Sequence, residues 1–312
     1  MGTADAHDGG PDAQPRARVD ASSAAAACAL PGEDAASRRF GGVARAYGDA
    51  GAARIAAAHA VVVGVGGVGS WAAEALARCG VGRLTLVDLD HVAESNVNRQ
   101  VHALGSTLGA SKVDTMAARI ADISPATVVE RVDDFVTVDN VAAIVPVQAD
   151  VVIDAIDAPR AKAALIALCV ARGVPVVVCG AAGGRLDPLA LTRSDVADAK
   201  GDALLASVRA RLRRDHGFPR ERGARFGVEA VWSPAPPGGA RPEFPGEAGM
   251  PLACAGYGSV VMVTAAMGFA AAAQALEAVL RPLRGTASPA PPRSSTRGTP
   301  PPARAASSAA GP

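Results

Sequence analysis

Short apolar runs alternate with helix-period segments along the middle of the chain. The runs are rich in valine, leucine and isoleucine, which is typical of strands buried on both faces of a parallel sheet. They lie at 60–63, 83–87, 127–132, 151–153 and 176–179. Between them, apolar residues recur every three or four positions, as in the helix expected to begin at Lys112. We therefore predict an α/β fold with a Rossmann-like, mostly parallel sheet and helices on both faces.

Changes in composition divide the chain into a folded domain and less regular segments. Residues 1–37 and 281–312 lack an apolar period, so we expect two disordered tails, the second of them basic. The folded domain is predicted over 38–280. Inside it, we expect a basic helical insertion at about 201–227 and a Pro/Gly-rich loop at about 233–250.

Three further elements follow from weaker patterns. An Arg-rich start at 38–47 is expected to turn at Gly41 and Gly42 before a short Ala-rich helix, and another short helix is expected over 138–145. The apolar segment 258–276 is long enough to raise the question of a membrane span. Its content of Ala, Gly, Ser and Thr favours a helix buried under the sheet, so no membrane contact is predicted.

Charge and cysteine content narrow the class of protein. The net charge is +1, which argues against nucleic-acid binding by the whole surface but allows a local basic patch. Only Lys112, Lys162 and Lys200 among the 31 basic residues are lysines, so each is a candidate for a position that requires a compact ammonium. The five cysteines are scattered without a CxxC pair, which argues against a disulfide framework or a four-cysteine zinc site. No secretory signal is apparent, and we expect a cytoplasmic protein.

The first strand leads into the glycine turn GVGGVG at 64–69, and a helical pattern follows at once. Glycines let the backbone turn sharply and approach phosphate oxygens, and the first helical turn offers free N–H groups. The second strand delivers Asp88 about twenty residues beyond the glycines, where a carboxylate can accept from ribose hydroxyls. This order predicts a nucleotide site. The alternative is a tight turn in an ordinary parallel sheet, and the glycines by themselves would suit NAD.

Polar residues follow where the loops after the strands are expected. The SNVNRQ segment at 95–100 comes after the second strand, and Lys112 follows it. Asp154 and Asp157 come after a later strand and are expected to face the crevice where open α/β sheets bind ligands. Cations with a carboxylate suit a triphosphate and a metal ion better than a nicotinamide. The alternative role for Asp157 is a helix N-cap.

The combination of GVGGVGS, LVDLD, SNVNRQ, SKV and DAID resembles the adenylating domain of the ubiquitin-activating-enzyme-like superfamily, which includes the ThiF family. These enzymes bind MgATP and activate a carboxylate as an acyl-adenylate. Within the superfamily, RRFGGVARAYG, NRQVHAL, VDDFVT, DAIDAPRAKAALI, GAAGGRLDP and CAGYGSVVMVTAAMGF resemble the tRNA threonylcarbamoyladenosine dehydratases. The likeness covers about residues 38–280.

The resemblance implies ATP and Mg²⁺ as cofactors and a role for each polar residue. The implied cofactor-binding residues are Gly64, Gly66, Gly67, Gly69, Asp88, Asp90, Asn96, Asn98, Arg99, Lys112 and Asp157. Arg99, Lys112 and Asp157 form the implied catalytic set, with Asp157 as the metal ligand. Arg39, or else Arg45, is expected to reach the site of the partner in a homodimer. Cys254 is a candidate nucleophile, although a free cysteine is more often a small buried hydrophobe.

The resemblance also implies a tRNA substrate. The expected RNA-binding residues are Arg209, Arg213, Arg214, Arg220 and Arg222, for which the alternative is a solvated helix face. In sulfur-carrier-activating relatives the magnesium-binding Asp is usually followed by Asn, whereas here Ala158 follows Asp157. That departure favours a substrate other than a ubiquitin-like protein.

The implied reaction is the ATP-dependent dehydration, or cyclisation, of threonylcarbamoyladenosine in tRNA through adenylation of its carboxylate. One alternative is adenylation of the C-terminus of a ubiquitin-like sulfur-carrier protein, and another is a non-catalytic nucleotide-binding scaffold. A sulfur-transfer protein is a further candidate partner.

Overall fold

The computed structural model describes residues 35–238 and 258–284. Within these ranges, seven strands form one sheet in the order β3-β2-β1-β4-β5-β7-β6. The strands are β1 (His59–Val63), β2 (Arg83–Val87), β3 (Val128–Val132), β4 (Val151–Asp154), β5 (Val176–Cys179), β6 (Thr192–Asp195) and β7 (Glu229–Trp232). Neighbouring strands are parallel except β6 and β7, an antiparallel pair at one edge. The predicted mostly parallel α/β sheet is confirmed.

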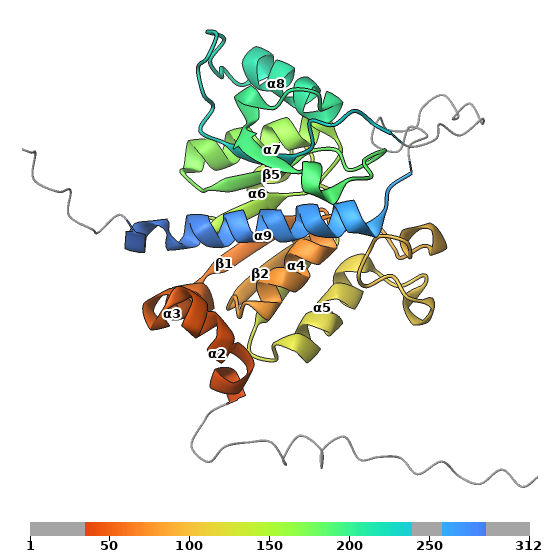
Figure 1. The fold of residues 1–312 in the computed structure, drawn as a ribbon, viewed down its shortest axis with the longest axis vertical. Helices are drawn as coiled ribbons and strands as arrows, with labels where there is room; N and C mark the ends of the chain where they lie inside the picture. The colour runs from red at the N-terminus through yellow and green to blue at the C-terminus, as the bar shows by residue number, and fades with distance from the viewer. Residues whose placement is uncertain (1–34, 239–257, 285–312) are drawn as a thin grey trace, which may run out of the picture.

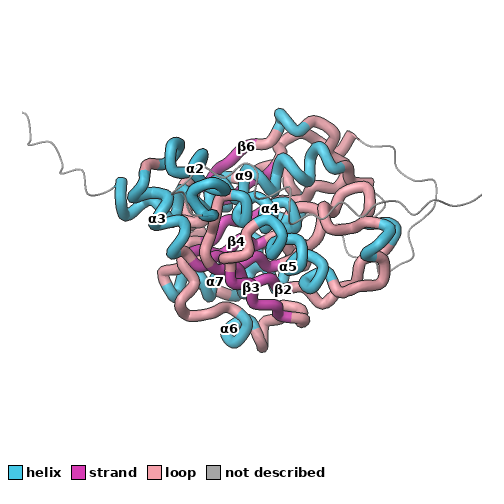
Figure 2. Tube along the Cα trace, turned by 90° about the horizontal axis from the view of Figure 1, so that it is seen from below, coloured by secondary structure: helices cyan, strands magenta, loops and turns pink. Residues whose placement is uncertain are grey.

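Helices cover both faces of this sheet (Figures 1 and 2). One face carries α3 (Asp49–Ala57), α4 (Gly69–Arg78), α5 (Lys112–Ile123) and α9 (Val261–Arg284), with α2 (Ala35–Tyr47) packed on α3. The other face carries α6 (Val141–Ile144), α7 (Pro159–Arg172) and α8 (Ala203–Asp215). Single 3₁₀ turns lie at Glu94–Asn96, Gly105–Thr107, Pro188–Ala190 and Val196–Asp198. Helices on both faces explain why the central strands are apolar at every position.

Alternate residues of each central strand enter two separate cores. In β1, which is buried throughout, Val62 packs with α4 and α9, whereas Val61 and Val63 pack with residues of α7 and α8. The strand order reverses at β1, because β2 lies on one side of it and β4 on the other. Such a reversal opens a crevice outside the carboxyl ends of the strands, where ligands of open α/β sheets bind.

Helix α9 crosses the front of the sheet in Figure 1 and packs closely on α4. Gly268 makes this approach feasible, because a Cβ there would lie 2.5 Å from the Val68 carbonyl oxygen. In the described part of the chain, the segment Val261–Arg281 is the one stretch long and apolar enough to cross a membrane, and 56% of its 18-residue apolar window is buried inside the protein. Met267, Ala271 and Leu276 belong to the core. The predicted helix buried under the sheet is therefore confirmed.

The predicted turn at Gly41 and Gly42 is wrong, because α2 runs through both glycines. A glycine inside a helix costs about 1 kcal/mol relative to alanine. Tertiary packing outweighs this cost: the Phe40 ring lies against Gly80, and Val43 packs on the core. The start of the folded domain therefore depends on contacts that local sequence does not reveal.

Two other boundaries differ from the prediction. The helix expected over 138–145 is the single turn α6, because Asn140 at its start bonds the backbone of Thr137 and Phe135 instead. The tail predicted over 1–37 overlaps the first three residues of α2. The rest of that tail, most of the predicted loop at 233–250, Cys254 and the chain beyond Arg284 lie outside the described residues.

Candidate functional site

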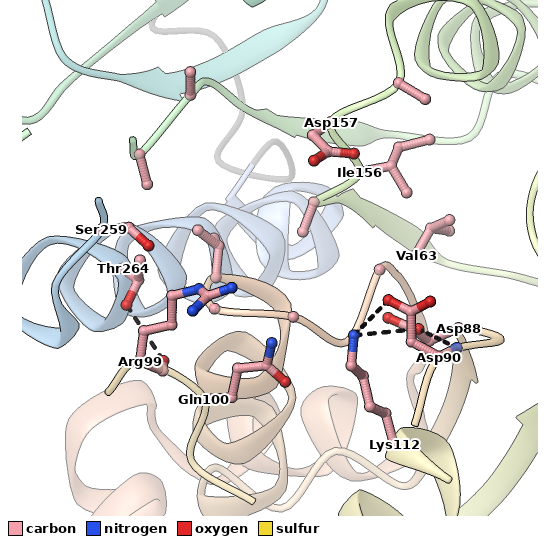
Figure 3. Close-up of a pocket in the computed structure, with 18 of the residues that line it drawn as sticks. Val63, Asp88, Asp90, Arg99, Gln100, Lys112, Ile156, Asp157, Ser259 and Thr264 are labelled. Carbon is pink, nitrogen blue, oxygen red and sulfur yellow. Dashed lines mark hydrogen bonds and ion pairs between the residues drawn. The ribbon is translucent and has the colours of Figure 1, made fainter. Parts of the chain in front are cut away.

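A cavity of about 730 Å³ opens at the carboxyl ends of the central strands, at the reversal in strand order (Figure 3). Its size lies within the range of about 300–1,000 Å³ that is typical of small-molecule sites. The predicted cofactor-binding residues that line it are Gly64, Gly66, Gly67, Asp88, Asp90, Asn96, Asn98, Arg99, Lys112 and Asp157. Gly69, in the first turn of α4, is not among the lining residues.

The glycine turn has a shape that other residues could not adopt. Gly64 has a φ of 85°, in the region that favours glycine. A Cβ on Gly69 would lie 1.8 Å from the Gly64 carbonyl oxygen, so the turn can close only without a side chain there. The Val65 N–H donates to Asp88 Oδ2 at 2.7 Å. Asp88 thus fixes the glycine turn from the neighbouring strand while lining the cavity.

Lys112 is buried at the start of α5, and its ammonium faces two carboxylates. The Nζ atom lies 2.6 Å from Asp90 Oδ2 and 3.8 Å from Asp88 Oδ1. Burial raises the pKa of Asp88 above its ordinary value, whereas Lys112 and the backbone N–H groups of Asp90 and Val65 act against that rise. The Lys112 ammonium is therefore held at the cavity wall by the carboxylates of Asp90 and Asp88. Asp88 is also the residue expected to bind the ribose.

Arg99 lies on the other side of the glycine turn. Its Nη1 donates to the Ser95 carbonyl oxygen at 2.5 Å and to Asn98 Oδ1 at 3.0 Å. Trp71 Nε1 donates to the Arg99 carbonyl oxygen at 3.0 Å. A Cβ on Gly67 would lie 3.3 Å from two carbons of the Arg99 side chain, so glycine is what lets this arginine approach the turn. Arg99 also carries N–H donors on Nε and Nη2, which could bond an anion in the cavity.

The two asparagines next to Arg99 also have structural partners. Asn96 Oδ1 accepts from the Ala93 N–H at 3.1 Å and closes its own turn. Asn98 Nδ2 donates to the Ser259 carbonyl oxygen at 2.7 Å, which ties this loop to the start of α9. Both side chains therefore shape the cavity wall, and the part they take in binding a cofactor stays a prediction.

Gln100 is a site residue that the sequence did not single out. Its side chain is 5% exposed and lines the cavity, and Oε1 is buried with no hydrogen-bond partner in the part of the chain that the structure describes. A buried amide oxygen without a partner suggests a ligand or water as its donor. The sequence feature that could have pointed to Gln100 is its position directly after Arg99 in the same polar segment.

Asp157 projects into the cavity from the wall opposite Lys112, in the turn between β4 and α7 (Figure 3). The N-cap residue of α7 is Ala158, with no side-chain capping bond, so the alternative N-cap role of Asp157 is wrong. No group of three or more His, Cys, Asp or Glu side chains gathers at one place in the described ranges. An ion at Asp157 would therefore take most of its ligands from water and a bound phosphate, as Mg²⁺ commonly does.

The structure contradicts the prediction that Asp154 faces the crevice. Asp154 is fully buried, and its Oδ1 lies 2.9 Å from Lys162 Nζ, which is also fully buried. Asp154 is the last residue of β4, where side chains still alternate between the two faces of the sheet, so its carboxylate lies on the face covered by α7 and not towards the cavity. Lys112 and Lys162 thus both pair with carboxylates in buried positions, whereas Lys200 is exposed.

Arg39 does not reach the cavity of its own chain. Its Nη1 donates to the carbonyl oxygens of Asp122 and Ile123 at the end of α5. The expected reach of Arg39 or Arg45 into a partner's site stays a prediction, because it requires a second copy of the chain.

The five arginines of the predicted RNA surface divide into two groups. Arg209 donates to the Ala199 carbonyl oxygen, Arg213 to Pro219 and Arg220 to the carbonyl oxygen of Arg213. Arg213 also lies over the Phe226 ring, 5.2 Å from its centroid. Arg214 and Arg222 are exposed, and Arg214 pairs with Asp215. Arg209 therefore ties α8 to the segment before it, Arg213 and Arg220 hold the loop after it, and the second group faces solvent.

Known proteins share both this sequence and this fold. Residues 39–296 match the ThiF family. The chain is 45% identical to the tRNA threonylcarbamoyladenosine dehydratase of Escherichia coli (strain K12) over 255 residues, which cover 79% of this chain and 95% of that protein.

Solved structures give the same result. The structure of E. coli tRNA N6-threonylcarbamoyladenosine dehydratase in complex with ATP is similar with a TM-score of 0.74 and 44% identity, over 81% of this chain and 98% of that chain. The complex with AMP is similar with a TM-score of 0.74 and 43% identity, over 82% of this chain and 100% of that chain. Since the family match spans most of the chain, this protein belongs to the ThiF family.

Proposed function

We propose that the protein is an ATP-dependent tRNA threonylcarbamoyladenosine dehydratase, which converts threonylcarbamoyladenosine in tRNA to its cyclic form. One observation carries the proposal. The glycine turn, Arg99 and Lys112 line the same cavity as Asp157, which lies opposite Lys112. The identity of 45% to a dehydratase over nearly its whole length, together with its likeness to ATP-bound and AMP-bound structures, supports the same function.

The proposed reaction has two steps. A carboxylate oxygen of the threonyl group attacks the α-phosphorus of ATP, an acyl-adenylate forms, and pyrophosphate leaves. The carbamoyl oxygen then attacks the activated carbonyl carbon, the ring closes, and AMP leaves as the carbamoyl nitrogen loses a proton. The oxygen that water would carry away leaves in AMP, so the sum is a dehydration.

The residues of the cavity support this chemistry mainly through charge and position. Arg99 and Lys112 would stabilise the negative charge that grows on the phosphates during attack, and fixed donors of this kind are often the largest catalytic term. The backbone of the glycine turn would cradle the phosphates, and Asp88 would accept from the ribose. No general base is assigned among the described residues: the second attack is intramolecular on an activated carbonyl, and the carbamoyl proton would pass to solvent.

We propose Mg²⁺ as the second cofactor, with Asp157 as its protein ligand. A single exposed carboxylate beside a phosphate site fits an ion that keeps several waters and takes the rest of its ligands from ATP. Bound there, the ion would neutralise phosphate charge.

A homodimer is the proposed assembly. Helix α9 exposes an apolar stripe at Met262 and Phe269, which are 58% and 48% exposed, and Leu189 near it is 91% exposed. Such a stripe suits contact with a second copy.

If Arg39 acts across the dimer, mixing an Arg39→Ala subunit with a Lys112→Ala subunit restores part of the activity that each lacks alone. Sedimentation of a Met262→Glu variant as a monomer would support the stripe as the contact; a monomeric wild type would contradict the assembly.

The proposed tRNA surface consists of the solvent-facing arginines after α8, such as Arg222. We propose a cytoplasmic location, because a tRNA substrate would be met there. A sulfur-transfer protein is proposed as a second partner, on the family resemblance alone. Affinity capture from cells with and without the tagged protein tests that partner, and recovery of no sulfurtransferase would argue against it.

The decisive experiment is mass spectrometry of tRNA nucleosides from a strain that lacks the protein, with and without a plasmid copy. We expect the cyclic nucleoside to disappear and to return with the wild-type copy but not with a Lys112→Ala copy. An unchanged nucleoside profile would favour the scaffold alternative. Pyrophosphate exchange driven by a ubiquitin-like sulfur carrier, and not by modified tRNA, would favour the adenylyltransferase alternative.

A further inference from the structure

Lys162 is fully buried in the first turns of α7 and uses all three of its N–H donors on one short segment. Its Nζ donates to Asp154 Oδ1 at 2.9 Å, to the Asp154 carbonyl oxygen at 3.1 Å and to the Ile156 carbonyl oxygen at 2.9 Å. Residues 154–156 are the end of β4 and the start of the turn that carries Asp157. The Lys162 ammonium therefore holds together the backbone segment that immediately precedes Asp157, the proposed metal ligand.

The same turn has few other bonds that fix its shape. Its start is held by the Ala155 N–H, which donates to the Val63 carbonyl oxygen at 2.9 Å, and by the Ile156 N–H, which donates to Asp154 Oδ1 at 3.2 Å. No side chain caps α7 at Ala158. Lys162 therefore holds the centre of the turn, through the Ile156 carbonyl oxygen.

The turn also lies against the glycine loop. A Cβ on Gly64 would lie 3.1 Å from both the carbonyl carbon and the oxygen of Ala155, and a Cβ on Gly69 would lie 3.3 Å from Ala155 Cβ. A shift of the turn would thus move the Asp157 carboxylate relative to the phosphate cradle. The distance between these two walls sets whether one ion can contact both a carboxylate and a phosphate.

Stability alone is a poor explanation for the buried pair. Taking an ammonium and a carboxylate out of water costs several kcal/mol per ion, and well-packed apolar residues of similar size are often at least as stabilising. Asp154 Oδ2 has no hydrogen-bond partner in the described ranges, so the pair is not even fully satisfied. An apolar side chain in place of Lys162 could not supply the three hydrogen bonds that its ammonium donates to this one segment.

We infer that Lys162 is a positioning residue: it holds the turn at 155–158 so that Asp157 faces the nucleotide phosphates and takes up the metal ion. The inference rests on the proposed function, since it takes Asp157 as the ligand of a divalent cation bound with ATP. Groups that orient a metal ligand typically contribute 10–100-fold to metal affinity or activity.

The test uses the full-length Lys162→Met/Asp154→Asn variant, which removes both buried charges at once and leaves no unpaired carboxylate. Mn²⁺ replaces Mg²⁺ as a probe, and electron paramagnetic resonance counts free Mn²⁺ in the presence of ATP. We expect the Mn²⁺ affinity of the ATP complex to fall about tenfold, with a matching rise in the Mg²⁺ concentration that half-saturates AMP release. If the double variant does not fold, Lys162→Gln/Asp154→Asn is measured instead, because the Gln amide keeps two N–H donors and no buried carboxylate is left unpaired.

The control is Glu74→Gln, which breaks the ion pair of the buried Glu74 carboxylate with the partly exposed Arg119, between α4 and α5 and away from the cavity. It should lower the melting temperature without changing the Mn²⁺ affinity. In an Asp157→Ala background, the change at Lys162 should have no further effect on Mn²⁺ affinity, because the two residues act in series.

An Mn²⁺ affinity that falls no more than in Glu74→Gln, or a loss that persists in the Asp157→Ala background, would overturn the inference. A wild-type protein that binds Mn²⁺ and ATP in the predicted way but releases no AMP with modified tRNA would instead overturn the proposed function. The two failures are therefore distinguishable.

Discussion

Lys112 Nζ lies 2.6 Å from Asp90 Oδ2, so the buried ammonium of Lys112 is paired at the cavity wall with a side chain that is 53% exposed. The lysine has little freedom to move, because it opens α5 and is itself only 5% exposed. A phosphate that enters the cavity would share or replace Asp90 as its partner. The pair thus keeps a cation in place for an anionic ligand while limiting the cost of burying it.

Replacement of Lys112 by alanine should lower the rate of AMP formation about 100-fold or more, because one fixed donor to a developing negative charge contributes about that much. AMP release is measured with ATP and modified tRNA. Lys200→Ala is the control, since Lys200 is exposed and does not line the cavity, and it should keep wild-type activity. Equal rates in the Lys112 variant and the control would exclude Lys112 from the reaction.

Gly69→Ala should destabilise the fold strongly, because its Cβ would lie 1.8 Å from the Gly64 carbonyl oxygen and the glycine turn would have to open. We expect a loss of about 3 kcal/mol or more in the free energy of unfolding, measured in urea. Gly105→Ala is the control, because a Cβ at Gly105 meets no heavy atom within 4 Å. A Gly69 variant as stable as the control would contradict the observed turn.

The stability of the protein should fall in acid because of His102. Burial lowers the pKa of His102 from its ordinary value of 6.5 to about 4, and both ring nitrogens are buried without a partner in the described part of the chain. Between these pH values the unfolded chain binds a proton that the folded protein excludes. The contribution of His102 is therefore unchanged above pH 6.5 and falls as the pH drops towards 4.

Between pH 7.5 and 5, His102 should remove about 2 kcal/mol from the free energy of unfolding. Urea unfolding of His102→Leu should show a pH dependence weaker by that amount. The matched control is the same measurement on His216→Gln, a substitution at an exposed histidine. A His102→Leu variant with the full wild-type slope would show that another group is responsible.

Arg222→Ala should weaken tRNA binding and lower the slope of log affinity against log salt by about one, as expected for a lost phosphate contact. Filter binding at several salt concentrations measures both quantities. Arg83→Ala is the control, because Arg83 is an exposed arginine at the start of β2, the end of the sheet opposite the cavity. Arg213→Ala should mainly lower stability, because Arg213 holds Pro219 and lies over Phe226.

The sequence by itself determined five of the seven described strands, the order of their βα units and most of the residues that line the cavity, whereas β6 and β7 were not predicted. Apolar runs mark buried parallel strands because both faces of such strands are covered, and the glycine spacing marks a turn that no other residue can make. Asp88, Arg99, Lys112 and Asp157 could be predicted because each follows a strand, and the carboxyl ends of parallel strands meet at one edge of the sheet.

Only the tertiary structure decided which carboxylate faces the cavity and what holds it there. Asp154 and Asp157 are three residues apart, but Asp154 is buried and Asp157 faces the cavity. This difference depends on where β4 ends and on the ammonium of Lys162, which reaches the turn from α7. The local sequence pattern also did not predict that α2 continues through Gly41 and Gly42. Nor did it predict that Arg209 and Arg213 donate hydrogen bonds to backbone carbonyl oxygens of neighbouring segments. In each case a contact between segments far apart in the chain outweighed the local preference, because packing and buried hydrogen bonds contribute more free energy than propensity does.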